Sequence, residues 1–279
     1  MSKIEKALNR AREERGTFLV PVPNTGAGRT PATGTAMVAD RTGHPETIAR
    51  MAVSESRLLS PGDLSQRGII HHQYAADPAV QVFRELRTKV VQQSQGRNGV
   101  ILVTAVSNDS GTSFVAQNLG AAFAFDAGKT ALVIDCNLKN PSMHRLLANA
   151  SLPGLTDYLE NPDFDIAHII HPVGIARYRV IPAGRRGEVP AEHFTSVKMR
   201  RLVDSVRLRY RERFIILDGP PMSDIADIRI LSELSDFVLI VARYGRATNT
   251  QIENCINAIS DKKLLGIVFN DEPRIPWIR

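Results

Sequence analysis

The stretch of this sequence best suited to chemistry runs from Val103 to Gly120 and reads VTAVSNDSGTSFVAQNLG. An apolar, strand-like run leads into a turn and then into a helix-like run. Loops that bind nucleotide phosphates have this build and usually read G-x-x-x-x-G-K-[ST], because backbone N–H groups and the positive end of the helix dipole attract phosphate oxygens. The residues predicted to bind nucleotide are Ser110, Gly111, Thr112 and Ser113. Thr112 stands where the usual pattern has lysine.

Two carboxylates follow apolar runs elsewhere in the chain. Asp135 ends the run TALVID, and Asp218 follows FIIL. Because ligands of open α/β sheets bind at the carboxyl ends of the strands, both carboxylates should lie beside the loop. Together with Ser113 they are the predicted ligands of Mg²⁺. An aspartate at a strand end is often only a turn or helix-cap residue, but the order and spacing of the three motifs favour a phosphate-loop fold.

The runs GVILVTAV, TALVID, YRVIPAG, FIILDGP, DFVLIVARY and LLGIVFN are separated by helix-length segments. Most of them are continuously apolar, as strands buried on both faces must be. Alternation of such strands with helices predicts an α/β fold with a doubly wound, mostly parallel sheet. With the loop and the carboxylates, this predicts a P-loop nucleotide-binding fold.

The composition is that of an ordinary soluble globular protein, with 43% hydrophobic and 23% charged residues. No apolar run approaches the roughly 18 residues of a membrane span, and the charged first residues do not resemble a secretory signal, so we expect a cytoplasmic protein. The net charge is +6. Its one concentrated stretch, residues 197–213, has apolar residues at helical spacing, so its arginines form either a solvated face or a functional basic patch.

Three regions are expected along the chain. Residues 1–16 read as a short helix with a narrow apolar stripe, which would be marginal alone and so should dock on something. Residues 17–77 are rich in Pro, Gly, Thr and Ala without a sustained period, which predicts a flexible linker. Residues 78–279 are the expected P-loop domain.

Several motifs resemble those of the bacterial tyrosine autokinases, which are relatives of the partition-type ATPases. VIDCNLKNPSMH resembles the family's I-D-x-D-x-R-x-P-x-x-H motif, and FIILDGPPMSDIAD resembles its later aspartate motif. QVFRELR resembles the helix E-x-x-R-x-x-R that packs one subunit against the next in a ring. MSKIEKALNRAREERG resembles the opening of family members encoded as separate cytoplasmic proteins.

The resemblance implies a nucleotide-binding protein of exopolysaccharide or capsule export. ATP or ADP with Mg²⁺ would be its cofactors, and an inner-membrane polysaccharide co-polymerase would recruit it to the membrane. By the same resemblance Asp135 is the candidate catalytic base and Asn270 a candidate contact to the purine. The implied interface of a homo-oligomer consists of Gln81, Arg84 and Arg87.

The sequence departs from the family pattern at positions that matter for catalysis. Thr112 cannot supply the ammonium that stabilises charge during phosphoryl transfer. The second aspartate of the family motif is Asn137 and its arginine is Lys139, while Gln81 replaces the leading glutamate of the ring helix. The printed chain has no tyrosine after Tyr244, whereas family kinases carry a tyrosine-rich tail of phosphoacceptors. Lys139 is one candidate for a substitute cation.

Three functions therefore remain open. The favoured one is a catalytically degenerate, kinase-like regulator or scaffold of the co-polymerase. The second is an active tyrosine autokinase or ATPase with a rearranged site, in which Lys129 or Lys139 reaches the phosphates. The third is a partition or positioning ATPase that binds DNA or membrane. No nucleic acid is expected as a partner, because the sequence lacks a basic-aromatic nucleic-acid signature.

Overall fold

The computed structural model describes residues 18–20, 58–185, 192–210 and 212–271. The helix predicted for residues 1–16 lies outside the described residues. Within them, no helix is both long enough and apolar enough to cross a membrane.

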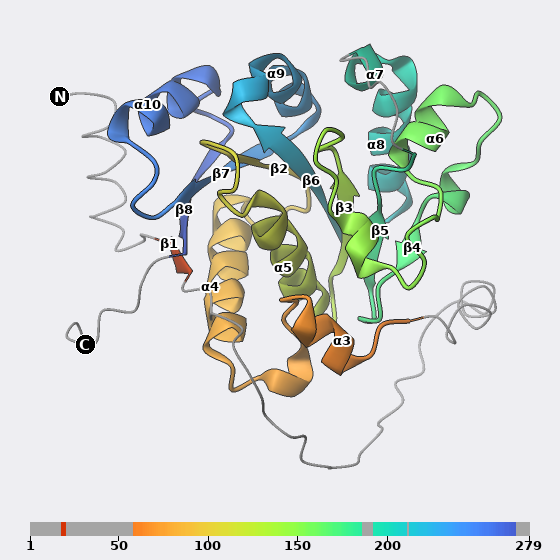
Figure 1. Cartoon of the computed structure of the whole chain (residues 1–279), viewed down its shortest axis with the longest axis horizontal. Coiled ribbons are helices and arrows are strands. Elements are labelled where there is room, and N and C mark those ends of the chain that lie inside the picture. The colour runs from red at the N-terminus through yellow and green to blue at the C-terminus, as the bar shows by residue number, and fades with distance from the viewer. Residues whose placement is uncertain (1–17, 21–57, 186–191, 211, 272–279) are drawn as a thin grey trace.

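The centre of the fold is an eight-stranded sheet in the order β1-β8-β7-β2-β6-β3-β5-β4 (Figure 1). All neighbouring strands are parallel except the pair β4 and β5. The predicted α/β class with a doubly wound, mostly parallel sheet is therefore confirmed. The strands are β1 (Phe18–Val20), β2 (Val100–Ala105), β3 (Thr130–Asp135), β4 (His171–Pro172), β5 (Tyr178–Ile181), β6 (Arg213–Pro221), β7 (Phe237–Arg243) and β8 (Leu264–Asn270).

Helices cover both faces of the sheet, so the strands carry apolar side chains on both sides. The helices are α3 (Pro61–Gln66), α4 (Pro78–Gln93), α5 (Thr112–Ala124), α6 (Leu155–Glu160), α7 (Glu192–Thr195), α8 (Val197–Arg209), α9 (Ile225–Leu234) and α10 (Asn249–Ala258). Short 3-10 turns span His72–Tyr74, Met143–Leu146, Ile166–His168 and Met222–Asp224.

The sheet separates two hydrophobic cores. One core joins α3, α4 and α5 to the sheet, with Phe83 and Leu119 packed near Val103 of β2. The other joins α6, α8, α9 and α10 to the opposite face, where Leu102 of β2 is buried. Figure 1 shows α4 and α5 lying across the first face. Alternate residues of one strand therefore point to different cores, which fixes the face on which each strand-end side chain lies.

The linker predicted for residues 17–77 is wrong in its described parts. Residues 18–20 form β1, which pairs with β8. Ser60 and Asp63 form a capping box at the start of α3, and Leu64 of α3 is fully buried. From α5, the Asn118 side chain accepts a hydrogen bond from the Ile70 amide (2.8 Å). The domain described by the structure therefore includes residues 58–77 and does not begin at residue 78.

Asn118 fixes this segment to the domain, because its amide group also donates to the carbonyl of Gly68 (2.9 Å). Replacing Asn118 with alanine leaves the Ile70 N–H and the Gly68 carbonyl without their partner. We expect Asn118→Ala to lower the free energy of unfolding by about 2–4 kcal/mol, measured by urea denaturation. Asn257→Ala, at an exposed position on α10, is the matched control. Equal stability of the two variants would contradict this role for Asn118.

Candidate functional site

The loop between β2 and α5 has the backbone of an anion-binding turn. Gly111 is the residue before the first turn of α5 and has a φ of 86°, a left-handed conformation that favours glycine. Space also demands glycine, since a Cβ there would lie 2.0 Å from Nδ2 of Asn270. The first N–H groups of a helix have no intrahelical partner, and no N-cap side chain bonds to those of α5. These amides, with the positive helix end, can receive a phosphate group.

The two predicted carboxylates lie side by side at the carboxyl edge of the sheet. Asp135 on β3 and Asp218 on β6 are register partners, and both are fully buried. Asp135 accepts three backbone hydrogen bonds, from Asn137 (3.2 Å), Ser142 (2.9 Å) and Met143 (2.9 Å). These bonds hold the Asp135 carboxylate in place.

Asp218 is in a different situation from its neighbour. Among the described residues, neither of its carboxylate oxygens has a hydrogen-bond partner. A buried carboxylate without a partner is costly, unless it is protonated or meets a cation. The donor set fits Mg²⁺, which binds through one or two carboxylates together with substrate phosphates. The described residues hold no group of three or more His, Cys, Asp or Glu side chains placed to bind one metal ion, so phosphate oxygens would have to complete the coordination.

Burial raises the pKa values of both carboxyl groups. Burial raises the pKa of Asp135 to about 6, although its three backbone hydrogen bonds act in the opposite direction. Burial, and then the neighbouring Asp135 charge, raise the pKa of Asp218 well above its usual range. The Ser113 hydroxyl lies close enough to lower the Asp218 pKa, without reaching hydrogen-bond geometry. Ser113, Asp135 and Asp218 thus lie close together, and their role as Mg²⁺ ligands remains a prediction.

The two lysines that were considered as replacements for the missing loop lysine make other contacts in the structure. Lys139 pairs with Asp224 at 2.5 Å, on the surface. Lys129 donates to Asn98 at 2.9 Å, immediately before β3 and hence at the opposite edge of the sheet from the loop.

Arg243, near the loop, was missed in the sequence, and Asn270 makes a contact other than the predicted one. Arg243 ends β7, and its guanidinium pairs with Asp271 (Nε to Oδ2 2.8 Å) and approaches the carbonyl of Asp109 in the loop (3.5 Å). Asn270, predicted as a purine contact, donates from Nδ2 to the carbonyl of Ser110 (2.9 Å). Its Oδ1 is buried without a hydrogen-bond partner among the described residues, so one acceptor remains for a ligand. The sequence signal that could have identified Arg243 is its position as a polar residue at the end of an apolar strand.

The predicted interface residues lie on α4, away from the loop. Gln81 and Arg87 both bond within their own chain, to the carbonyls of Ala75 (3.1 Å) and Ala122 (3.2 Å) respectively. Arg84 is partly exposed. Their role between subunits remains a prediction.

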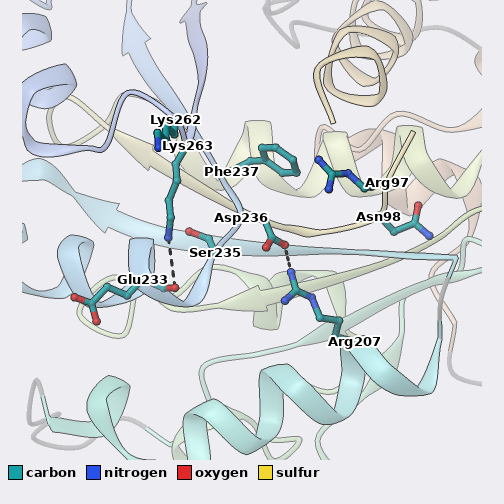
Figure 2. Close-up of a pocket in the computed structure, with 9 residues that line it drawn as sticks. All are labelled: Arg97, Asn98, Arg207, Glu233, Ser235, Asp236, Phe237, Lys262 and Lys263. Atoms are coloured by element: carbon teal, nitrogen blue, oxygen red, sulfur yellow. Dashed lines mark hydrogen bonds and ion pairs between the residues drawn. The ribbon is translucent and has the colours of Figure 1, made fainter. Parts of the chain in front are cut away.

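A cavity of about 740 Å³ lies elsewhere, beside the starts of β2 and β7. Figure 2 shows two of its cations already engaged, Arg207 with Asp236 and Lys263 with the backbone of Glu233. This is the amino edge of the sheet, opposite the edge where ligands of α/β sheets bind. The loop and the carboxylate pair, not this cavity, form the candidate nucleotide site. The residues that line the cavity are Arg97, Asn98, Arg207, Glu233, Ser235, Asp236, Phe237, Lys262 and Lys263.

Comparison with known proteins places this geometry among bacterial kinases. No protein-family model matches the chain. The tyrosine-protein kinase wzc of Salmonella typhi is 29% identical over 197 residues, 70% of this chain and 27% of that protein. The chimerical protein CapA2B2 is 25% identical with a TM-score of 0.68, covering 75% of this chain and 91% of that one. The kinase domain of Escherichia coli tyrosine kinase ETK has a TM-score of 0.64 at 24% identity, covering 82% and 94% respectively.

These similarities concern one part of the longer relatives. The chain spans between 24% and 31% of the length of curated relatives such as the tyrosine-protein kinases etk and ptk.

The raised pKa values predict how stability depends on pH in the ligand-free protein. A carboxyl whose folded pKa is raised contributes stability at low pH that is lost as the pH rises through that pKa. We therefore expect stability to fall from about pH 4 to pH 6 through Asp135, and to fall in addition through Asp218 as the pH rises toward the raised pKa of that carboxyl. Asp218→Asn should raise the unfolding free energy at pH 7.5 by about 1–3 kcal/mol and flatten this pH dependence.

Thermal unfolding between pH 5 and 8 checks this expectation, with Asp204→Asn on the exposed face of α8 as the control for loss of one negative charge. If Asp218→Asn is no more stable than the parent at pH 7.5, the carboxylate is not the unsatisfied group described above.

Proposed function

Because the described domain of this chain belongs to the bacterial tyrosine autokinase family, we propose that the protein is a tyrosine-kinase-like subunit that binds nucleotide but is impaired in phosphoryl transfer. The observation that carries this proposal is the contrast between an intact carboxylate pair and a loop without lysine. Asp135 and Asp218 have the donors for Mg²⁺, whereas Thr112 brings no positive charge to the phosphates.

Each part of the nucleotide has a proposed set of partners. The amides from Ser110 to Ser113 receive the β- and γ-phosphates. Ser113, Asp135 and Asp218 hold Mg²⁺, which neutralises phosphate charge when it is bound. The buried Oδ1 of Asn270 is an acceptor for a purine amino group.

The impairment follows from electrostatics. Losing one preorganised positive group usually removes a few kcal/mol of transition-state stabilisation, or roughly a hundredfold or more in rate. Asp135 remains the candidate base, because a carboxylate with a pKa of about 6 is largely ionised at neutral pH. The site therefore keeps its candidate base but lacks the positive group that would stabilise the transition state. This combination favours nucleotide binding over phosphoryl transfer.

The cellular role we propose is that of a regulator or scaffold of a polysaccharide co-polymerase at the inner membrane. The support is the family membership, since relatives such as wzc are much longer proteins named as tyrosine kinases. The α4 residues Gln81, Arg84 and Arg87 are the proposed contacts between copies of the chain. In this role the protein acts from the cytoplasm and is required for export of exopolysaccharide or capsule, independently of phosphoryl transfer.

Calorimetric titration with Mg-ADP and Mg-ATP, alongside Thr112→Lys, tests the nucleotide site. We expect weak binding by the parent, at least about tenfold tighter ATP binding by Thr112→Lys, and roughly a hundredfold gain in phosphoryl transfer. Thr112→Met supplies similar length without charge and should give neither gain. If the parent transfers phosphate as fast as Thr112→Lys, the protein is an active kinase and the proposal fails.

The scaffold role has its own test in a deletion strain. Secreted polysaccharide should be lost without the protein and restored equally by the parent and by Asp135→Ala. Restoration by the parent alone would show that the Asp135 carboxylate is required, for Mg²⁺ binding or for transfer, and a role independent of it would be wrong.

A further inference from the structure

The phosphate loop is held on one side by the ends of β7, which lies next to β2, and of β8, which lies next to β7. Asn270 donates from Nδ2 to the carbonyl of Ser110 at 2.9 Å, within the protein interior. Arg243 directs a guanidinium nitrogen at the carbonyl of Asp109 at 3.5 Å. Two consecutive carbonyls of the loop thus face donors that come from β8 and β7.

The sheet brings these two donors together. Arg243 and Asn270 are register partners at the carboxyl ends of β7 and β8. Two residues earlier on each strand, Val241 and Val268 are buried in the core beneath α4 and α5. Because strand side chains alternate between faces, Arg243 and Asn270 project on the face that α5 covers, where the loop enters that helix.

Holding a carbonyl also orients the next amide. A trans peptide is planar, so its C=O and N–H point in opposite directions, and the described chain contains no cis peptide. When the carbonyls of Asp109 and Ser110 turn toward β7 and β8, the N–H groups of Ser110 and Gly111 turn away from them. That direction leads to the start of α5 and the carboxylates on β6 and β3, where phosphate and Mg²⁺ are expected.

We propose that Asn270 and Arg243 are positioning residues that fix the amides of the phosphate loop in a binding orientation before nucleotide arrives. This inference rests on the proposed function in that the loop binds phosphate. It gives Asn270 a task beyond any contact to the base. It also identifies how a loop without lysine keeps an ordered anion site, through fixed backbone dipoles in place of a side-chain charge.

The pairing of Arg243 supports positioning over a direct role at the phosphates. Its Nε and a terminal nitrogen both contact Oδ2 of Asp271, at 2.8 and 2.6 Å. This ion pair neutralises the guanidinium and restrains it beside the loop. Gly111 completes the arrangement, because any side chain there would occupy the position of the Asn270 amide.

The first experiment measures the ligand-free protein, so it does not depend on binding. Backbone ¹⁵N order parameters of Ser110 and Gly111 should be near 0.85 in the parent and below about 0.6 in Asn270→Ala, with a smaller fall in Arg243→Gln. Asn257→Ala and Arg246→Gln, at exposed positions, remove the same groups elsewhere and should leave both values unchanged. Unchanged order in both Asn270→Ala and Arg243→Gln would overturn the proposal.

The second experiment titrates inorganic pyrophosphate with Mg²⁺, a probe that has no base. Asn270→Ala and Arg243→Gln should each weaken pyrophosphate binding, by roughly tenfold for Asn270→Ala. If Asn270→Ala weakens Mg-ADP binding but not pyrophosphate binding, Asn270 serves the base alone and the positioning role is wrong. If the parent binds neither ligand, the proposed nucleotide function fails, while the order parameters still decide the positioning role. Because Arg243 is partly exposed, its variant keeps the test valid if Asn270→Ala unfolds.

Discussion

The arrangement of this protein depends on the burial of two carboxylates side by side at one edge of the sheet. Asp135 and Asp218 are brought together by the register of β3 and β6, and water is excluded from both. Backbone amides satisfy one of them and nothing among the described residues satisfies the other. An apolar pair at these positions would make a more stable sheet, so folding alone does not account for the pair, and a bound cation is the explanation we propose.

On the other side of the loop the strand ends carry hydrogen-bond donors in place of carboxylates. Across β8, β7, β2, β6 and β3, an amide and a guanidinium flank the loop on one side and two carboxylates flank it on the other. A polyphosphate with its metal ion would lie between them, along the opening of α5. The family's lysine would have added charge at the centre of this row, and Thr112 leaves that centre neutral. Binding and transfer can therefore be separated in one site, since the residues that shape the loop differ from the residue that would stabilise moving charge.

Much of the fold and of the candidate site could be predicted from the sequence. The contacts that could not be predicted all join residues that are far apart in the chain. The buried strands show as continuous apolar runs, and the loop, Asp135 and Asp218 follow directly from what ends those runs. The contacts of Asn270 with Ser110 and of Arg243 with Asp109 join residues 160 and 134 positions apart. Local periodicity carries no information about which strand ends will be neighbours.

Long-range contacts also explain why the prediction of a flexible linker was wrong for residues 58–77. Residues 58–77 contain one six-residue helix, and the Asn118 side chain that holds the backbone of this segment comes from 48 positions away. A segment that is stabilised by a distant side chain looks irregular when it is viewed alone.

The pairing of β1 with β8 has a practical consequence for anyone who isolates the domain. In the described structure β1 covers the outer side of β8, and residue 20 pairs with Asn270. A fragment that starts after residue 20 exposes the backbone donors and acceptors of β8 as an open sheet edge, a template for pairing with other chains. Self-association of such a fragment would then result from the strand edge that truncation exposes. The oligomeric state of the fragment would therefore not report on that of the intact chain.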